Sequence, residues 1–207
     1  MNSNLNQAIS YDWLMAHASN PDDGLARAFA GVIQAADKGE IQPPNLAMGL
    51  SKKKFLALLA CYFPGVEGEI CGDTDKDSYT DCAALPTDEF DDLLALLLEH
   101  RSDAADHTEW LAYAMASGCM GENHLYQDMG LVNRQTLNAL LERYFPTLYL
   151  KNTGNMKWKK FFYKQLCERA EIKMCPAPSC NVCVDYHHCF ATEEDELTQV
   201  VVTDSVI

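Results

Sequence analysis

The chain has 207 residues, of which 48% are hydrophobic and 22% are charged, and its 16 basic and 30 acidic residues give a formal net charge of −14. This length suits one domain or at most two small ones, and the apolar fraction excludes disorder for most of the chain. A protein this acidic is repelled by nucleic-acid phosphates and by anionic lipid surfaces, which argues against a general nucleic-acid binder.

The first twenty residues lack the basic stretch and apolar run of a secretory signal. No segment reaches the roughly 18 apolar residues that a membrane-spanning helix needs. We therefore expect a cytoplasmic protein. Nine cysteines in a compartment that keeps thiols reduced favour metal ligation by some of them over a disulfide framework.

The first part of the chain predicts three helices followed by a long loop. Apolar residues recur at helical spacing over about residues 4–18, 22–38 and 51–62. Residues 65–86 are rich in Gly and Asp, which favours a loop.

The rest of the chain predicts four more helices. One begins after Thr87, a good N-cap residue, and the next covers about residues 104–118. Two further helices follow Asn133 and Asn155, and Pro146 ends the first of them. The apolar stripes of the helices after Thr87, Asn133 and Asn155 are, in that order, Phe90, Leu93, Leu94, Leu97 and Leu98; Leu137, Leu140, Leu141 and Tyr144; and Trp158, Phe161, Phe162 and Leu166.

These patterns predict an all-α fold, because the single strand-like run, residues 200–203, stands alone. We expect one helical domain over residues 1–170 and a cysteine-rich segment that binds a metal cluster over residues 171–192. An acidic, flexible tail is expected over residues 193–207.

Charge is distributed unevenly near the C-terminus. Residues 151–173 hold seven Lys or Arg and two Glu, a net charge of +5, whereas residues 174–207 hold six acids and no Lys or Arg. Lys157, Lys160 and Lys164 recur at helical spacing, on the side away from the aromatic stripe. This lysine face is either a solvated helix surface or a surface that faces an anion or docks a partner.

Four of the nine cysteines lie within fifteen residues near the C-terminus, in a Cys-x4-Cys-x2-Cys-x5-Cys array: Cys175, Cys180, Cys183 and Cys189. Thiolates suit iron–sulfur clusters, zinc or copper(I). Structural zinc sites commonly use two widely separated Cys-x2-Cys pairs, whereas a short run of cysteines is typical of clusters, so the spacing favours an iron–sulfur centre. His187 and His188 either tune or complete this centre or are ordinary surface histidines.

His124 and Asp128 form a second candidate site, because they lie one turn apart if their segment is helical. Such a pair serves ligation or proton transfer, or it is structural. Cys119 and Cys167 are further thiols, but single cysteines in helices are typically core residues.

Two stretches carry a family resemblance. Residues 155–190 join the lead-in Met-Lys-Trp-Lys-Lys-Phe-Phe to the four-cysteine array, and residues 124–131 read His-Leu-Tyr-Gln-Asp-Met-Gly-Leu. Together they resemble the NifQ family of nitrogen-fixation proteins, most strongly over about residues 110–190. Tyr126 stands where that family is expected to have tryptophan.

The resemblance implies a carrier rather than an enzyme. Such a protein would hold a molybdenum–iron–sulfur cluster and donate molybdenum for biosynthesis of the nitrogenase iron–molybdenum cofactor, with NifEN and NifH as recipients. The implied ligands are Cys175, Cys180, Cys183 and Cys189.

Molybdenum would arrive as molybdate, an oxyanion that needs local positive potential or hydrogen-bond donors. The lysine face and the His124–Asp128 pair are the candidates for that role. Two alternatives stay open: a zinc-stapled helical interaction module, and an iron–sulfur redox protein.

Overall fold

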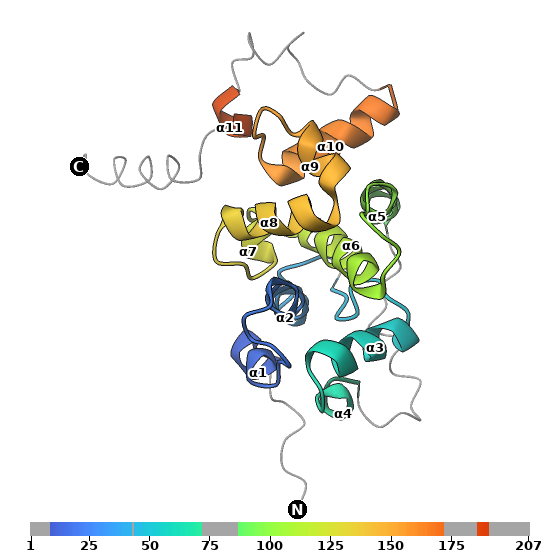
Figure 1. Ribbon diagram of the computed structural model, residues 1–207, viewed down its shortest axis with the longest axis vertical. Helices are drawn as coiled ribbons and strands as arrows, with labels where there is room; N and C mark the ends of the chain where they lie inside the picture. Colours follow the sequence, from blue (N-terminus) through green and yellow to red (C-terminus); the bar gives the residue numbers. More distant parts are fainter. Residues whose placement is uncertain (1–8, 43, 72–86, 172–185, 191–207) are drawn as a thin grey trace, which may run out of the picture. The chain divides into compact units, whose positions relative to one another are not determined.

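The computed structural model describes residues 9–42, 44–71, 87–171 and 186–190 (Figure 1). Every regular element in these ranges is a helix, which confirms the predicted all-α fold. The chain divides into two compact units, Met1–Lys151 and Asn152–Ile207. None of the helices in the described ranges is long and apolar enough to span a bilayer.

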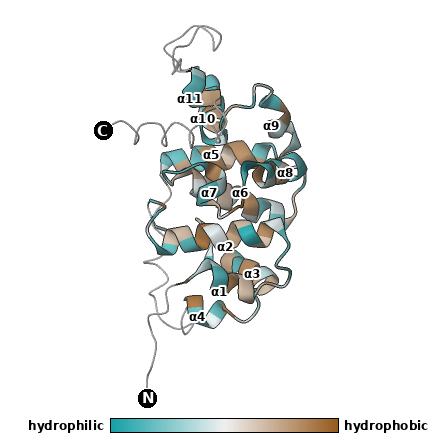
Figure 2. Ribbon diagram, turned by 90° about the vertical axis from the view of Figure 1, so that its left-hand side faces the viewer, coloured by the Kyte–Doolittle hydropathy of each residue, from teal (hydrophilic) through white to brown (hydrophobic). Residues whose placement is uncertain are grey.

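The first unit contains nine of the described helices. They are α1 (Tyr11–Ala16), α2 (Gly24–Asp37), α3 (Lys52–Tyr62), α4 (Glu67–Cys71), α5 (Asp88–Glu99), α6 (Asp106–Cys119), α7 (Leu125–Asp128), α8 (Arg134–Tyr144) and α9 (Pro146–Lys151). Helix α2 packs against α6, while α5 packs on α6 and α1 on α2, and both α7 and α8 also contact α2. Figure 2 shows hydrophobic and hydrophilic residues within the same helices, as expected of helices with one buried face.

Side-chain caps explain where most of the longer helices begin. The side chains of Ser10, Asp23, Ser51, Thr87 and Asn133 each accept a backbone N–H from the first turn that follows. Each such cap stabilises its helix by about 1 kcal/mol. The predicted cap Thr87 is therefore confirmed, and the helix predicted to follow Asn133 begins directly after it.

The buried stripes of α5 and α8 agree closely with the sequence. Helix α8 buries all four predicted residues. Helix α5 buries Phe90, Leu93, Leu94 and Leu97 as predicted, but it buries Leu96 in place of Leu98, which is only partly covered. The reason is that Leu93, Leu96, Leu97 and His100 form the i, i+3, i+4, i+7 stripe that faces the core.

One loop prediction needs correction, and the prediction that Pro146 stops a helix is confirmed. Residues 67–71 form α4, so the predicted loop over residues 65–86 is wrong in that part, and residues 72–86 lie outside the described residues. Pro146 does end α8, but it is also the first residue of α9. Proline suits that position because the first helical N–H has no partner within the helix.

A close backbone approach joins α2 to the end of α7. A Cβ atom placed on Gly31 would overlap the carbonyl group of Met129, and one on Gly130 would lie 2.6 Å from Gly31 Cα. Gly130 also has a φ of +63°, which side chains disfavour. Glycine at both positions therefore lets α7 pack directly on α2.

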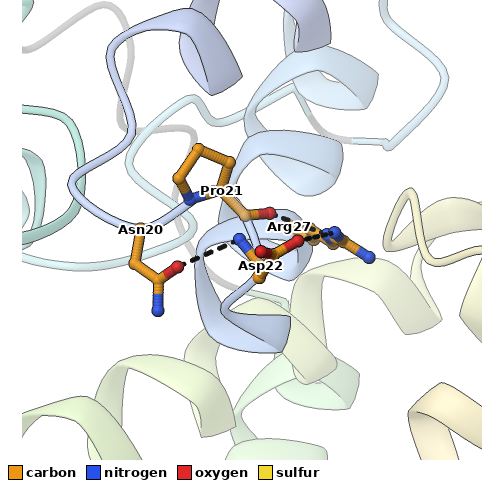
Figure 3. Close-up of polar contacts among 4 residues, drawn as sticks. All are labelled: Asn20, Pro21, Asp22 and Arg27. Atoms are coloured by element: carbon orange, nitrogen blue, oxygen red, sulfur yellow. Dashed lines mark hydrogen bonds and ion pairs between the residues drawn. The ribbon is translucent and has the colours of Figure 1, made fainter.

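Arg27 closes the turn between α1 and α2 (Figure 3). Its Nε donates to the Pro21 carbonyl at 2.9 Å, and its Nη2 lies 3.1 Å from Asp22 Oδ1. The Asn20 side chain accepts the Asp22 backbone N–H. Because the ion pair is exposed, it contributes less than about 1 kcal/mol, and the contacts serve mainly to shape the turn.

The second unit contains α10 (Trp158–Arg169) and α11 (Tyr186–Phe190) among its described residues. Helix α10 starts two residues later than predicted, because Asn155 adopts a left-handed φ of +53° and Lys157 takes the N-cap position. Trp158, Phe161 and Phe162 are buried as predicted, whereas Leu166 is only partly buried.

Candidate metal centre

The predicted ligand Cys189 lies in α11, where its side chain is partly buried. The other three predicted ligands, Cys175, Cys180 and Cys183, lie outside the described residues. Cys189 is therefore the residue from which the geometry of the candidate centre can be built.

Contacts within the second unit hold α11 against the turn that precedes α10. The backbone N–H of Lys157 donates to the carbonyl oxygen of Cys189 at 2.9 Å. The ring of Phe190 lies against Gly154, where an added Cβ would come within 3.1 Å of the ring. Tyr186 stacks on Phe190 with 4.4 Å between the ring centroids. These contacts fix the backbone that carries the Cys189 thiol.

The turn itself is closed by one asparagine. Asn152 accepts the backbone N–H of Met156 and donates to its carbonyl, both at 2.8 Å. The left-handed conformation of Asn155 completes the reversal of the chain. This turn leads directly into the stretch Met-Lys-Trp-Lys-Lys-Phe-Phe that carries the family resemblance, and it brings Lys157 beside α11.

Lys160 brings a positive charge to the predicted ligand. Its Nζ lies 3.8 Å from Cys189 Sγ, within reach of a hydrogen bond to sulfur. Lys160 is exposed, so water screens this interaction while the sulfur is a free thiol. The pair nevertheless places a cation beside a predicted ligand sulfur in a strongly acidic chain.

The predicted lysine face needs correction. Lys157 is only 8% exposed and precedes α10 as its N-cap residue, so helical spacing does not place its side chain on an exposed face. Lys164 is partly exposed and pairs with Glu168 across one helical turn at 3.6 Å. The three lysines therefore differ in their surroundings instead of forming one solvated stripe.

His187 and His188 are exposed residues of α11 and directly precede Cys189, the one predicted ligand among the described residues. The ring of His187 meets Tyr186 edge-on, with the centroids 6.0 Å apart. Their predicted part in the centre stays a prediction.

The His124–Asp128 segment is helical, as the second candidate site requires, with His124 as the N-cap residue of α7. Asp128 is only 4% exposed, and its carboxylate accepts both the backbone N–H and the side-chain amide of Asn123, at 3.1 and 2.9 Å. The ring of His124 stacks on Tyr126. These contacts favour the structural interpretation of Asp128, because its carboxylate closes the turn before α7.

A polar cluster that covers the buried His100 was missed in the sequence. His100 Nδ1 lies 2.7 Å from Thr147 Oγ1, and Nε2 lies 3.2 Å from Lys151 Nζ. A lysine ammonium only donates, so in this arrangement Nε2 accepts from Lys151 and Nδ1 donates to Thr147. The available signal was the position of His100, which continues the buried stripe of α5 one turn beyond Leu96 and Leu97.

The other described thiols do not extend the candidate centre. Cys119 is buried in α6, as expected for a core residue, and Cys167 is partly buried in α10. Across the described part of the chain, no three His, Cys, Asp or Glu residues are grouped so that they could hold a metal ion. The described donor set is thus one thiol beside one ammonium, which suits an anionic thiolate-bound cluster and supplies one of its four predicted ligands.

Comparison with known proteins gives consistent matches. The NifQ family model matches residues 28–191. Protein NifQ of Azotobacter vinelandii is 36% identical over 152 residues, which cover 70% of this chain and 78% of that protein. Protein NifQ of Rhodobacter capsulatus is 32% identical over 173 residues, which cover 84% of this chain and 91% of that protein. No solved structure matches the chain.

Proposed function

The chain belongs to the NifQ family of nitrogen-fixation proteins, and on that premise we propose that it is a molybdenum carrier. In this proposal the four cysteines of residues 175–189 hold an iron–sulfur cluster that takes up molybdenum. The protein then donates the molybdenum for biosynthesis of the nitrogenase iron–molybdenum cofactor, and it turns over no organic substrate.

The observation that carries this proposal is the concentration of four thiols within fifteen residues, one of them on a helix whose backbone is fixed. Four thiolates are a complete set of protein ligands for one iron–sulfur cluster. When bound, the cluster would supply the sulfur-rich site at which a further metal is accommodated. The residues Cys175, Cys180, Cys183 and Cys189 would hold it.

Molybdenum reaches the site as molybdate, which is cargo rather than a resident cofactor. An oxyanion is repelled by a chain of net charge −14, so local cations are needed to admit it. Residues 151–173, with a net charge of +5, supply them. We assign this role to the exposed ammonium of Lys160 and the partly exposed one of Lys164, because Lys157 is buried.

The proposed recipients are NifEN and NifH. Donation can be tested with protein loaded anaerobically with radioactive molybdate, freed of unbound molybdate, and mixed with NifEN and NifH. We expect the label to move to NifEN, even when excess unlabelled molybdate is present. The matched control is a variant with all four cysteines changed to alanine, which should transfer no label.

Direct donation would be contradicted if the label stayed on the chain. It would also be contradicted if NifEN acquired only unlabelled molybdenum from the excess molybdate. The two alternatives give other results. A zinc-stapled interaction module would be colourless after anaerobic purification, whereas an iron–sulfur protein is brown. A simple redox protein would contain iron and no molybdenum.

A further inference from the structure

The contact between Lys160 and Cys189 joins two elements that are far apart in the sequence. Lys160 is the third residue of α10, and Cys189 is the fourth residue of α11. Their side chains meet because the Lys157 N–H binds the Cys189 carbonyl and Phe190 packs on Gly154. The contact is therefore a consequence of how α11 is seated, and its geometry does not depend on a metal.

The cation of this contact comes from a basic segment, whereas the cysteine segment that it meets is acidic. Residues 174–207 contain six acids and neither Lys nor Arg, so the cysteine segment brings no cation of its own. A cluster bound by four thiolates adds further negative charge. The ammonium that lies 3.8 Å from Cys189 Sγ is placed to offset this charge.

We propose that Lys160 is a positioning residue for the iron–sulfur cluster, whose ammonium donates a hydrogen bond to the Cys189 sulfur while that sulfur ligates iron. This inference rests on the proposed function and adds a residue outside the cysteine array. A hydrogen bond from a charged donor to a ligating sulfur is stronger than one between neutral groups. It also orients the ligand and stabilises the more negative, reduced state of the cluster.

Two properties of the loaded protein should therefore depend on Lys160. Without the ammonium, the cluster should lose iron to a chelator faster, by on the order of tenfold, as is typical when a partner of a metal ligand is removed. Its reduction potential should also fall, because the reduced state loses a stabilising positive charge.

The test compares the full-length chain with Lys160→Gln, Lys160→Arg and Lys53→Gln, each reconstituted anaerobically with iron and sulfide. Lys160→Gln should release iron faster and have a lower potential, whereas Lys160→Arg should retain most of both properties because it keeps a charged donor. Lys53→Gln is the matched control, since it removes an equal charge from an exposed position in α3. It should behave like the unchanged chain.

Because Lys160 is exposed, its substitution should leave the helical circular dichroism spectrum unchanged. If the original chain holds a cluster, and Lys160→Gln matches it in both the rate of iron release and the reduction potential, this inference alone is overturned. Equal losses in Lys160→Gln and Lys160→Arg would also overturn it. An unchanged chain that binds no iron would overturn the proposed function as well.

Discussion

Asp103 shows how one carboxylate replaces a missing helix cap. The N-cap residue of α6 is Ala105, which has no side chain to accept the first N–H groups. Asp103 Oδ1 accepts the Ala105 N–H at 3.0 Å and the hydroxyl of the buried Thr108 at 2.7 Å. The Thr108 bond above all, and then the Ala105 bond, lower the pKa of Asp103 below its ordinary value.

The lowered pKa makes the contribution of Asp103 to stability depend on pH. That contribution is fully present above the ordinary pKa of the carboxyl group and is lost as the pH falls through the lowered pKa of the folded state. Asp103→Ala should therefore reduce Tm at about pH 7, and the difference from the unchanged chain should shrink as the pH falls through the lowered pKa of Asp103. Thermal unfolding at a series of pH values measures this. A difference that does not depend on pH would show that the charge of Asp103 has no part in the cap.

Residue-level surroundings also explain which site predictions changed. Lys157 lies at helical spacing from Lys160 and Lys164, but it precedes α10 and is buried. Spacing predicts a shared face only within a helix, and the sequence does not show that Asn155 would turn the chain and delay the start of α10. The partner of Cys189 could not be predicted either, because Lys160 is 29 residues away and meets it only through the seating of α11.

At the level of elements, the packing of α7 on α2 depends on two glycines. Gly31→Ala would place a methyl group into the Met129 carbonyl, and neither backbone can move without unpacking its helix. We expect the free energy of unfolding to fall by about 3 kcal/mol or more. Urea denaturation measures the change.

Gly68→Ala is the matched control for this substitution. Gly68 lies in α4, and an added Cβ would meet nothing within 4 Å. Alanine favours a helix over glycine, so this variant should be as stable as the unchanged chain or more stable, by up to about 1 kcal/mol. If Gly31→Ala behaved in the same way, the direct contact between α2 and α7 would be ruled out.

The longer helices could be predicted because their signals are local. Helices α5 and α8 have a capping side chain at the start and an apolar stripe along the helix, and both signals lie within about a dozen residues. The short helices α4, α7, α9 and α11 span six residues or fewer, too few to show a period. Their stability comes from tertiary contacts such as those of Gly130 on α2 and Phe190 on Gly154.

For the whole molecule, the separate core of the first unit bears on how the protein responds to metal loss. Met1–Lys151 is a compact unit that buries large side chains from several helices, including Phe29, Phe55 and Phe145. None of the four cysteines predicted to hold the cluster belongs to it. We therefore expect this unit to fold without a cluster.

Hydrogen exchange can test this expectation on the apo and the loaded chain. The amides of α2 and α6 should be equally protected in both forms, whereas those of α11 should exchange more slowly when Cys189 ligates the cluster. A carrier that releases its metal must survive the loss with most of its fold intact. Loss of protection throughout α2 and α6 in the apo form would instead indicate that metal binding drives the folding of the whole chain.

The most direct test of the central claim, that the four-cysteine array holds an iron–sulfur cluster that takes up molybdenum, is metal analysis combined with electron paramagnetic resonance. The protein would be purified anaerobically from cells grown with molybdate, beside a variant in which Cys175, Cys180, Cys183 and Cys189 are alanine. We expect iron and molybdenum together, with a cluster signal, in the unchanged chain and neither metal in the variant. Zinc alone, no metal, or equal iron and molybdenum in both proteins would contradict the account.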